Sequence, residues 1–173
     1  GSGPLVRGSI GGGGATVEGT VSKAFDFSRW ISYAGLVGLG GGWLLVTVWP
    51  AGRDDRRARR LVWSGWGAVT LGALLELLLQ GPYTAGSGLS KITSGALLDD
   101  TLHTNYGHLH SVRLVVLGVL AVVLARALDP DSRRARYLAG ALGIAVVWTF
   151  SDAGHGSTTK PAWLSVPVDM LHV

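Results

Sequence analysis

Long apolar stretches separated by short charged clusters dominate the pattern of this chain. The twenty residues from Trp30 to Trp49 carry no charge. As a helix they would be about 30 Å long, which matches the hydrocarbon core of a bilayer. A second apolar stretch, Leu61 to Gln80, contains Glu76 as its one charged residue and is followed by Gly81 and Pro82, which we expect to end it.

Two further stretches are shorter. Only twelve uncharged residues separate Arg113 from Arg126, but both arginines can extend their guanidinium groups toward opposite interfaces and so lengthen the usable span. The stretch that ends near Asp152 has similar flanks. The pattern therefore predicts an all-α polytopic transmembrane helix bundle with four spans and the start of a fifth. The spans are expected at about 28–49, 61–80, 109–128 and 135–152, with the next helix beginning near 167.

The charged connections alternate along the chain. Five arginines lie within residues 53–60, and Arg133, Arg134 and Arg136 follow the third span, whereas the long connection between the second and third spans carries only Lys91 as a basic residue. Basic connections remain on the cytoplasmic side of a membrane. The alternation predicts a multi-pass protein of the cytoplasmic membrane, with its N-terminus and the long loop outside.

Composition supports a membrane protein and limits the alternatives. Of the residues, 47% are hydrophobic and 15% are charged, against about 25% charged in a soluble domain. Twelve of the fifteen basic residues are arginines that lie mostly beside apolar segments, so we do not expect nucleic-acid binding. Cysteine is absent, which excludes disulfides and thiolate ligands. Residues 1–24 are Gly-rich and are expected to form a flexible linker or tag before a transmembrane domain at 25–173.

The predicted topology places all five histidines on the outer side. His155 follows the fourth span and His172 opens the next helix, beside Met170 and Asp169. Imidazole and thioether groups suit copper, so these four residues are the candidate metal ligands. His103, His108 and His110 lie in the long loop or at the start of the third span and are weaker candidates, because loop histidines are commonly solvated.

Ionisable residues within the spans form a second set of candidates. Glu76 and Arg113 both fall near the outer ends of adjacent spans, so they could form an ion pair that orients the two helices. Alternatively, Glu76, Arg113 and Asp152 could line a polar vestibule beneath the histidines, because ionisable groups inside membranes commonly mark pathways.

Several motifs resemble the copper resistance protein D family of bacterial membrane proteins. They are the runs Leu78–Gly86, Thr104–Gly107, Ser151–Gly156 and Val168–His172. The resemblance implies copper handling at the cytoplasmic membrane, beside a periplasmic copper-binding domain or protein that is sometimes fused upstream. Among the histidines, only His155 and His172 match positions of the family.

These observations together predict a copper-binding integral membrane protein of copper transport or resistance, which we do not expect to be an enzyme. The chain has no nucleotide-binding P-loop. Two alternatives remain open. One is a membrane redox protein that binds b-type haem through two axial histidines, and the other is a non-catalytic membrane subunit that docks a partner.

Overall fold

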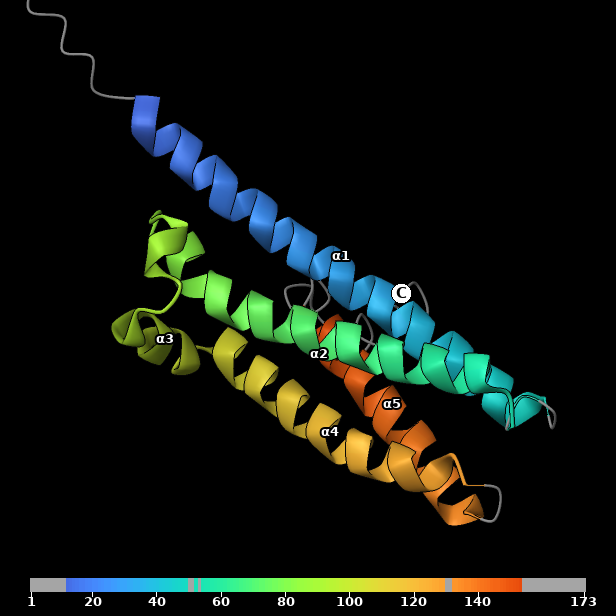
Figure 1. Ribbon diagram of the computed structural model, residues 1–173. Helices are drawn as coiled ribbons and strands as arrows, with labels where there is room; N and C mark the ends of the chain where they lie inside the picture. The colour runs from blue at the N-terminus through green and yellow to red at the C-terminus, as the bar shows by residue number, and fades with distance from the viewer. Residues whose placement is uncertain (1–11, 50–51, 53, 130–131, 154–173) are drawn as a thin grey trace, which may run out of the picture.

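The computed structural model describes residues 12–49, 52, 54–129 and 132–153, which form helices joined by short connections (Figure 1). The elements are α1 (Gly12–Val48), α2 (Arg56–Thr84), the 3₁₀ helix η2 (Leu89–Lys91), α3 (Gly95–Leu102), α4 (Asn105–Ala127) and α5 (Arg133–Ala153). No strand occurs in these described ranges. The prediction of an all-α protein is therefore confirmed for this part of the chain.

Three helices are long and apolar enough to cross a membrane within the described ranges. They are α1 over Gly19–Val48, α2 and α4, and they correspond to the first three predicted spans. The α5 helix covers the predicted fourth span but is not among these three, so a fourth crossing stays a prediction. The fifth helix expected near 167 lies outside the described residues.

The α1 and α2 helices are both longer than the apolar stretches that predicted them. The α1 helix begins at Gly12 instead of near Ser28, and so includes half of the segment that we expected to be a flexible linker. Adding residues to an existing helix costs far less than nucleating a new one, which lets a Gly-rich segment continue it. The α2 helix runs past Pro82 to Thr84, so the expected stop comes one turn late.

The long connection between α2 and α4 also contains structure that the hydrophobic pattern did not predict. It includes η2 and the eight-residue helix α3, which packs against α2 and α4. The Thr104 hydroxyl then caps α4 by accepting a hydrogen bond from the Gly107 amide at 3.1 Å. Because α4 begins at Asn105, both His108 and His110 lie in its first two turns.

The bundle consists of two packed pairs. The α1 and α2 helices lie along each other, as do α4 and α5, and α2 contacts α4 (Figure 1). Apolar side chains fill the space between the helices, and the large ones that are most deeply buried are Val46, Val62, Val69, Leu117, Leu120, Leu124 and Val146.

Close contact between α1 and α2 depends on glycine. A methyl group added at Gly72 would collide with the hydroxyl of Ser32 and would lie 2.8 Å from the Ser32 amide nitrogen. Small residues allow membrane helices to approach this closely. The approach brings Ser32 of α1 beside Glu76, one turn after Gly72 on α2.

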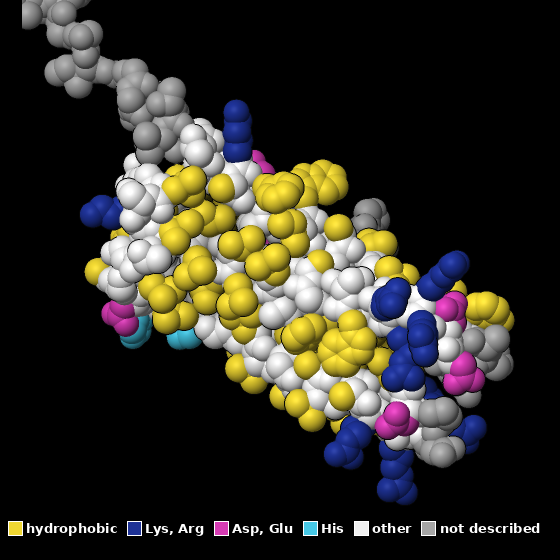
Figure 2. Space-filling model, viewed as in Figure 1, with side chains coloured by type: hydrophobic (Ala, Val, Ile, Leu, Met, Phe, Trp, Pro, Cys, Tyr) yellow, Lys and Arg dark blue, Asp and Glu magenta, His cyan; other side chains and the backbone are white. Residues whose placement is uncertain are grey.

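The surface separates apolar from basic regions. Figure 2 shows hydrophobic side chains over the middle of the molecule, while most of the basic side chains gather at the end where α1 joins α2 and α4 joins α5. Large apolar side chains such as Val37, Val115 and Val122 are about 70% exposed, as expected for a surface that faces lipid. The two arginine-rich connections therefore lie at one end of the bundle, and α3 lies at the other (Figure 1).

Candidate functional site

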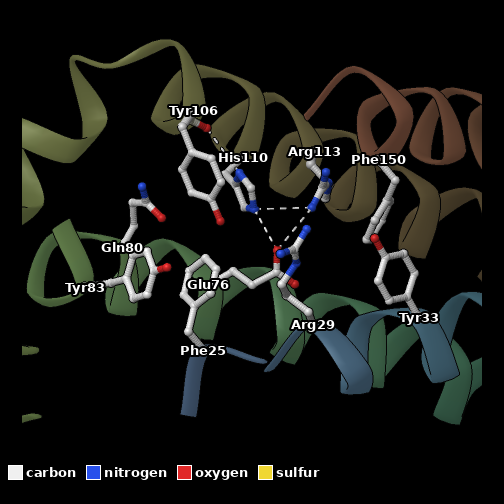
Figure 3. Close-up of a pocket in the computed structure, with 10 residues that line it drawn as sticks. All are labelled: Phe25, Arg29, Tyr33, Glu76, Gln80, Tyr83, Tyr106, His110, Arg113 and Phe150. Atoms are coloured by element: carbon white, nitrogen blue, oxygen red, sulfur yellow. Dashed lines mark hydrogen bonds and ion pairs between the residues drawn. The ribbon is translucent and has the colours of Figure 1, made fainter. Parts of the chain in front are cut away.

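A cluster of polar side chains, Ser32, Glu76, His110, Arg113 and Thr149, is buried between the helices, with the Glu76 carboxylate at its centre. The Ser32 hydroxyl of α1 donates a hydrogen bond to Glu76 Oε1 at 2.6 Å. The second oxygen, Oε2, lies 3.1 Å from His110 Nε2 and 3.7 Å from Arg113 Nη1, both on α4 (Figure 3). Glu76, His110 and Arg113 are each at most 5% exposed. Both carboxylate oxygens thus have partners, as burial of a charge requires.

Arg113 connects the cluster to α5. Its Nε donates to Thr149 Oγ1 at 2.9 Å, and its Nη2 donates to the Thr149 carbonyl at 2.7 Å. The guanidinium carbon lies 3.7 Å from the centre of the Phe150 ring, so a cation–π contact covers one of its faces. Hydrogen bonds, ring contact and carboxylate together compensate for removing this cation from water.

His110 uses both of its ring nitrogens. Nδ1 lies 3.1 Å from the carbonyl oxygen of Tyr106, and a carbonyl only accepts, so this nitrogen carries a hydrogen. Nε2 lies 3.3 Å from Arg113 Nη1. A neutral imidazole accepts a hydrogen bond from Arg113 there, and a charged imidazolium donates one to Glu76. The Tyr106 ring stacks on the imidazole with centroids 4.0 Å apart, which fixes its orientation.

A pocket of about 260 Å³ opens beside this cluster. Its lining combines charged, hydroxyl-bearing and aromatic side chains from four helices: Phe25, Arg29, Tyr33, Glu76, Gln80, Tyr83, Tyr106, His110, Arg113 and Phe150 (Figure 3). The hydroxyl of Tyr106 is buried and has no hydrogen-bond partner among the described residues. The pocket therefore offers unused donors to an occupant.

The sequence candidates separate into three groups. Glu76 and Arg113 meet, as one of the two sequence interpretations supposed. The loop histidines do not lie together. His103 follows the end of α3, where it is exposed and contacts Asp99. His108 is exposed on α4, whereas His110 is buried in the cluster. No group of three or more His, Asp and Glu side chains in the described ranges is placed to hold a metal ion.

The strongest metal candidates belong to the C-terminal end of the sequence. His155, Asp169, Met170 and His172 lie outside the described residues. Asp152 belongs to the last turn of α5, but the structure does not describe its side chain. Their proposed roles therefore stay predictions.

The hydrophobic pattern did not predict the residues that complete the cluster. Ser32 and Thr149 are small polar residues within apolar stretches, and Tyr106 and Phe150 provide the ring faces. The charged residues within the apolar stretches were the signal for such partners, because a buried charge needs hydrogen-bonding groups from neighbouring helices. The sequence does not reveal which of several Ser and Thr residues face inward.

Three long apolar helices with lipid-compatible surfaces and an internal ionic cluster define a multi-pass helical membrane protein. Residues 20–164 match the family model of the copper resistance protein D-like N-terminal domain. The match covers most of the chain, so the chain belongs to this family. No curated protein and no solved structure shows significant similarity to it.

Proposed function

We propose that this membrane domain binds copper on the outer face of the cytoplasmic membrane and contributes to copper transport or resistance. The observation that carries the proposal is the family match over residues 20–164. The orientation comes from the arginine clusters, which lie at one end of the bundle (Figure 2) and favour the cytoplasmic side. The opposite end, with α3 and the start of α4, then faces outward.

Within this proposal, metal capture belongs to His155 and His172, with Met170 and Asp169 as further ligands. About sixteen residues separate the two histidines in the sequence. Bringing the ends of a segment of that length together costs only a few kcal/mol, which metal–imidazole bonds can offset. A periplasmic copper-binding domain or protein is the partner that would deliver or accept the ion. The protein performs no catalysis in this scheme.

The buried cluster has a different role in the proposal. Arg113 Nη1 lies 3.3 Å from the one imidazole nitrogen that could face a metal, so a bare cation would be repelled there. The contacts of Glu76, His110 and Arg113 instead join α1, α2, α4 and α5. We therefore assign to the cluster the task of holding the helices in position beneath the outer metal site.

The test compares histidine variants of the full chain, purified in detergent and loaded with copper at neutral pH. His155→Ala and His172→Ala should each lower the bound copper severalfold and weaken copper-dependent growth by a similar factor. His103→Ala serves as the matched control, because this exposed imidazole contacts only its own helix, and it should retain its copper.

Equal copper content in the wild type and the His155/His172 double variant would overturn the assignment. Absorbance of the same preparations distinguishes the haem alternative, since a b-type haem protein purified without added metal would show a Soret band that the double variant loses.

A further inference from the structure

We infer that the pocket beside Arg29 and Arg113 binds an oxyanion, namely the phosphate group of an anionic lipid or a free phosphate. The inference goes beyond copper handling and does not depend on it. It rests on the charge of the lining, on the donors that the lining leaves unused and on the position of the pocket in the bundle.

The charge of the lining favours an anion. Two guanidinium groups, Arg29 and Arg113, face one carboxylate, Glu76. That carboxylate is fully engaged, because Oε1 accepts from Ser32 and Oε2 lies against His110 and Arg113. Arg29 is exposed and lies 6.0 Å from the centre of the Phe25 ring; it forms no ion pair with a described carboxylate. Its positive charge is left for an occupant.

The hydrogen-bonding groups point to the same class of ligand. The Tyr106 hydroxyl is buried, finds no hydrogen-bond partner in the part of the chain that the structure describes, and points into the pocket (Figure 3). The side chains of Tyr33, Tyr83 and Gln80 line the same space. Hydroxyl and amide donors together with a guanidinium suit a ligand that is rich in acceptors and negatively charged. A metal cation would find few free acceptors here.

The position of the pocket favours a lipid as the source of the phosphate. Arg29 lies between Phe27, which is 66% exposed, and Trp30, which is 72% exposed. Tyr83 stacks on Phe25 with ring centroids 5.0 Å apart, close to the end of α2. Trp and Tyr favour the boundary between hydrocarbon and head groups, and basic pockets between membrane helices bind lipid head groups. The opening therefore lies at the depth of lipid phosphates.

The experiment measures ligand binding to the delipidated full chain in a neutral detergent. Short-chain phosphatidylglycerol, short-chain phosphatidylcholine and inorganic phosphate are each titrated at low ionic strength, and the thermal unfolding midpoint is followed. We expect saturable stabilisation by phosphatidylglycerol, with at least about tenfold weaker binding of phosphatidylcholine, because only the first carries a net charge for Arg29. Native mass spectrometry counts the bound molecules.

Three variants assign the site. Arg29→Gln should weaken binding about tenfold, the effect of losing one charge-assisted contact. Tyr106→Phe should weaken it severalfold while leaving the unfolding midpoint of the ligand-free protein nearly unchanged, because the hydroxyl makes no hydrogen bond to a described residue. Lys23→Gln removes a charge from the same helix outside the pocket and should bind like the wild type.

The arms of the experiment also separate the two sources of phosphate. If inorganic phosphate binds with the same dependence on Arg29 and the lipid does not, the pocket takes a soluble phosphate and the oxyanion assignment stands. Absence of binding in both arms, or wild-type affinity in Arg29→Gln, would overturn it. Copper is not present in these titrations, so their failure leaves the proposed copper function untouched.

Discussion

Glu76 and Arg113 show how two charges are tolerated inside an apolar bundle. Each is nearly free of solvent contact, and each has several partners on other helices. A buried ion pair adds little net stability compared with apolar residues, but removing one member leaves the other charge without compensation. The pair therefore specifies how α2, α4 and α5 fit together.

Removal of the Glu76 carboxylate charge should destabilise the protein. Glu76→Gln should lower the free energy of unfolding by about 3 kcal/mol or more, because Arg113 then lacks its counter-ion. The double variant with Arg113→Gln should recover at least about 1 kcal/mol of the summed single losses. Thermal unfolding of the purified variants measures both quantities, and losses that simply add would show that the two residues do not interact.

At the scale of elements, the contact between α1 and α2 positions the cluster. Gly72 lies against the backbone of Ser32 and of Ser28. This contact brings the Ser32 hydroxyl within 2.6 Å of Glu76. The small residues of the two helices thus have a specific consequence, since a wider separation would leave one carboxylate oxygen without a donor.

A pair of alanine substitutions on α2 tests this contact. Gly72→Ala should destabilise the protein by about 1–3 kcal/mol, because its methyl group meets backbone atoms that cannot move without separating the helices. Gly67→Ala is the matched control, since nothing lies within 4 Å of the added methyl group. It should be neutral or stabilising by up to about 1 kcal/mol, as expected for a more helix-favouring residue. Equal changes in the unfolding midpoint of the two variants would contradict the proposed close contact.

The whole molecule has two chemically different ends. The connections rich in arginine lie together at one end, and α3 and the start of α4 form the other (Figures 1 and 2). Exposed His103 and His108 belong to the second end, and so does the polar cluster, which lies within about three turns of the start of α4. If the arginine-rich end faced outward instead, these groups would lie on the cytoplasmic side.

Labelling of single cysteines tests the orientation of the whole molecule. Positions 57 and 95 are exposed at opposite ends of the bundle. The wild-type chain contains no cysteine, so each variant carries a single one. In intact cells, a membrane-impermeant maleimide should label Gly95→Cys and spare Arg57→Cys until the cells are permeabilised. The reverse pattern at both positions would invert the topology and move the histidines to the inner face.

The class of protein and much of its helical framework follow from the order of apolar and charged residues along the chain. Apolar stretches of span length and alternating arginine clusters reflect the lipid solvent, which acts on each segment separately. For this reason the helices could be predicted without knowledge of their neighbours. Their ends were less accurate, as at Gly12 and Thr84, because helical hydrogen bonding continues beyond the hydrocarbon core.

Which polar residues act together depends instead on how the helices pack. The sequence placed Glu76 and Arg113 at similar depths, but depth does not specify the face of a helix that a side chain occupies. Helix rotation and packing place Ser32 and Thr149 inward and bury His110 among the charges, while His108 remains on the surface two residues away. Such choices depend on contacts between segments far apart in the chain, and these contacts form only when the helices have packed.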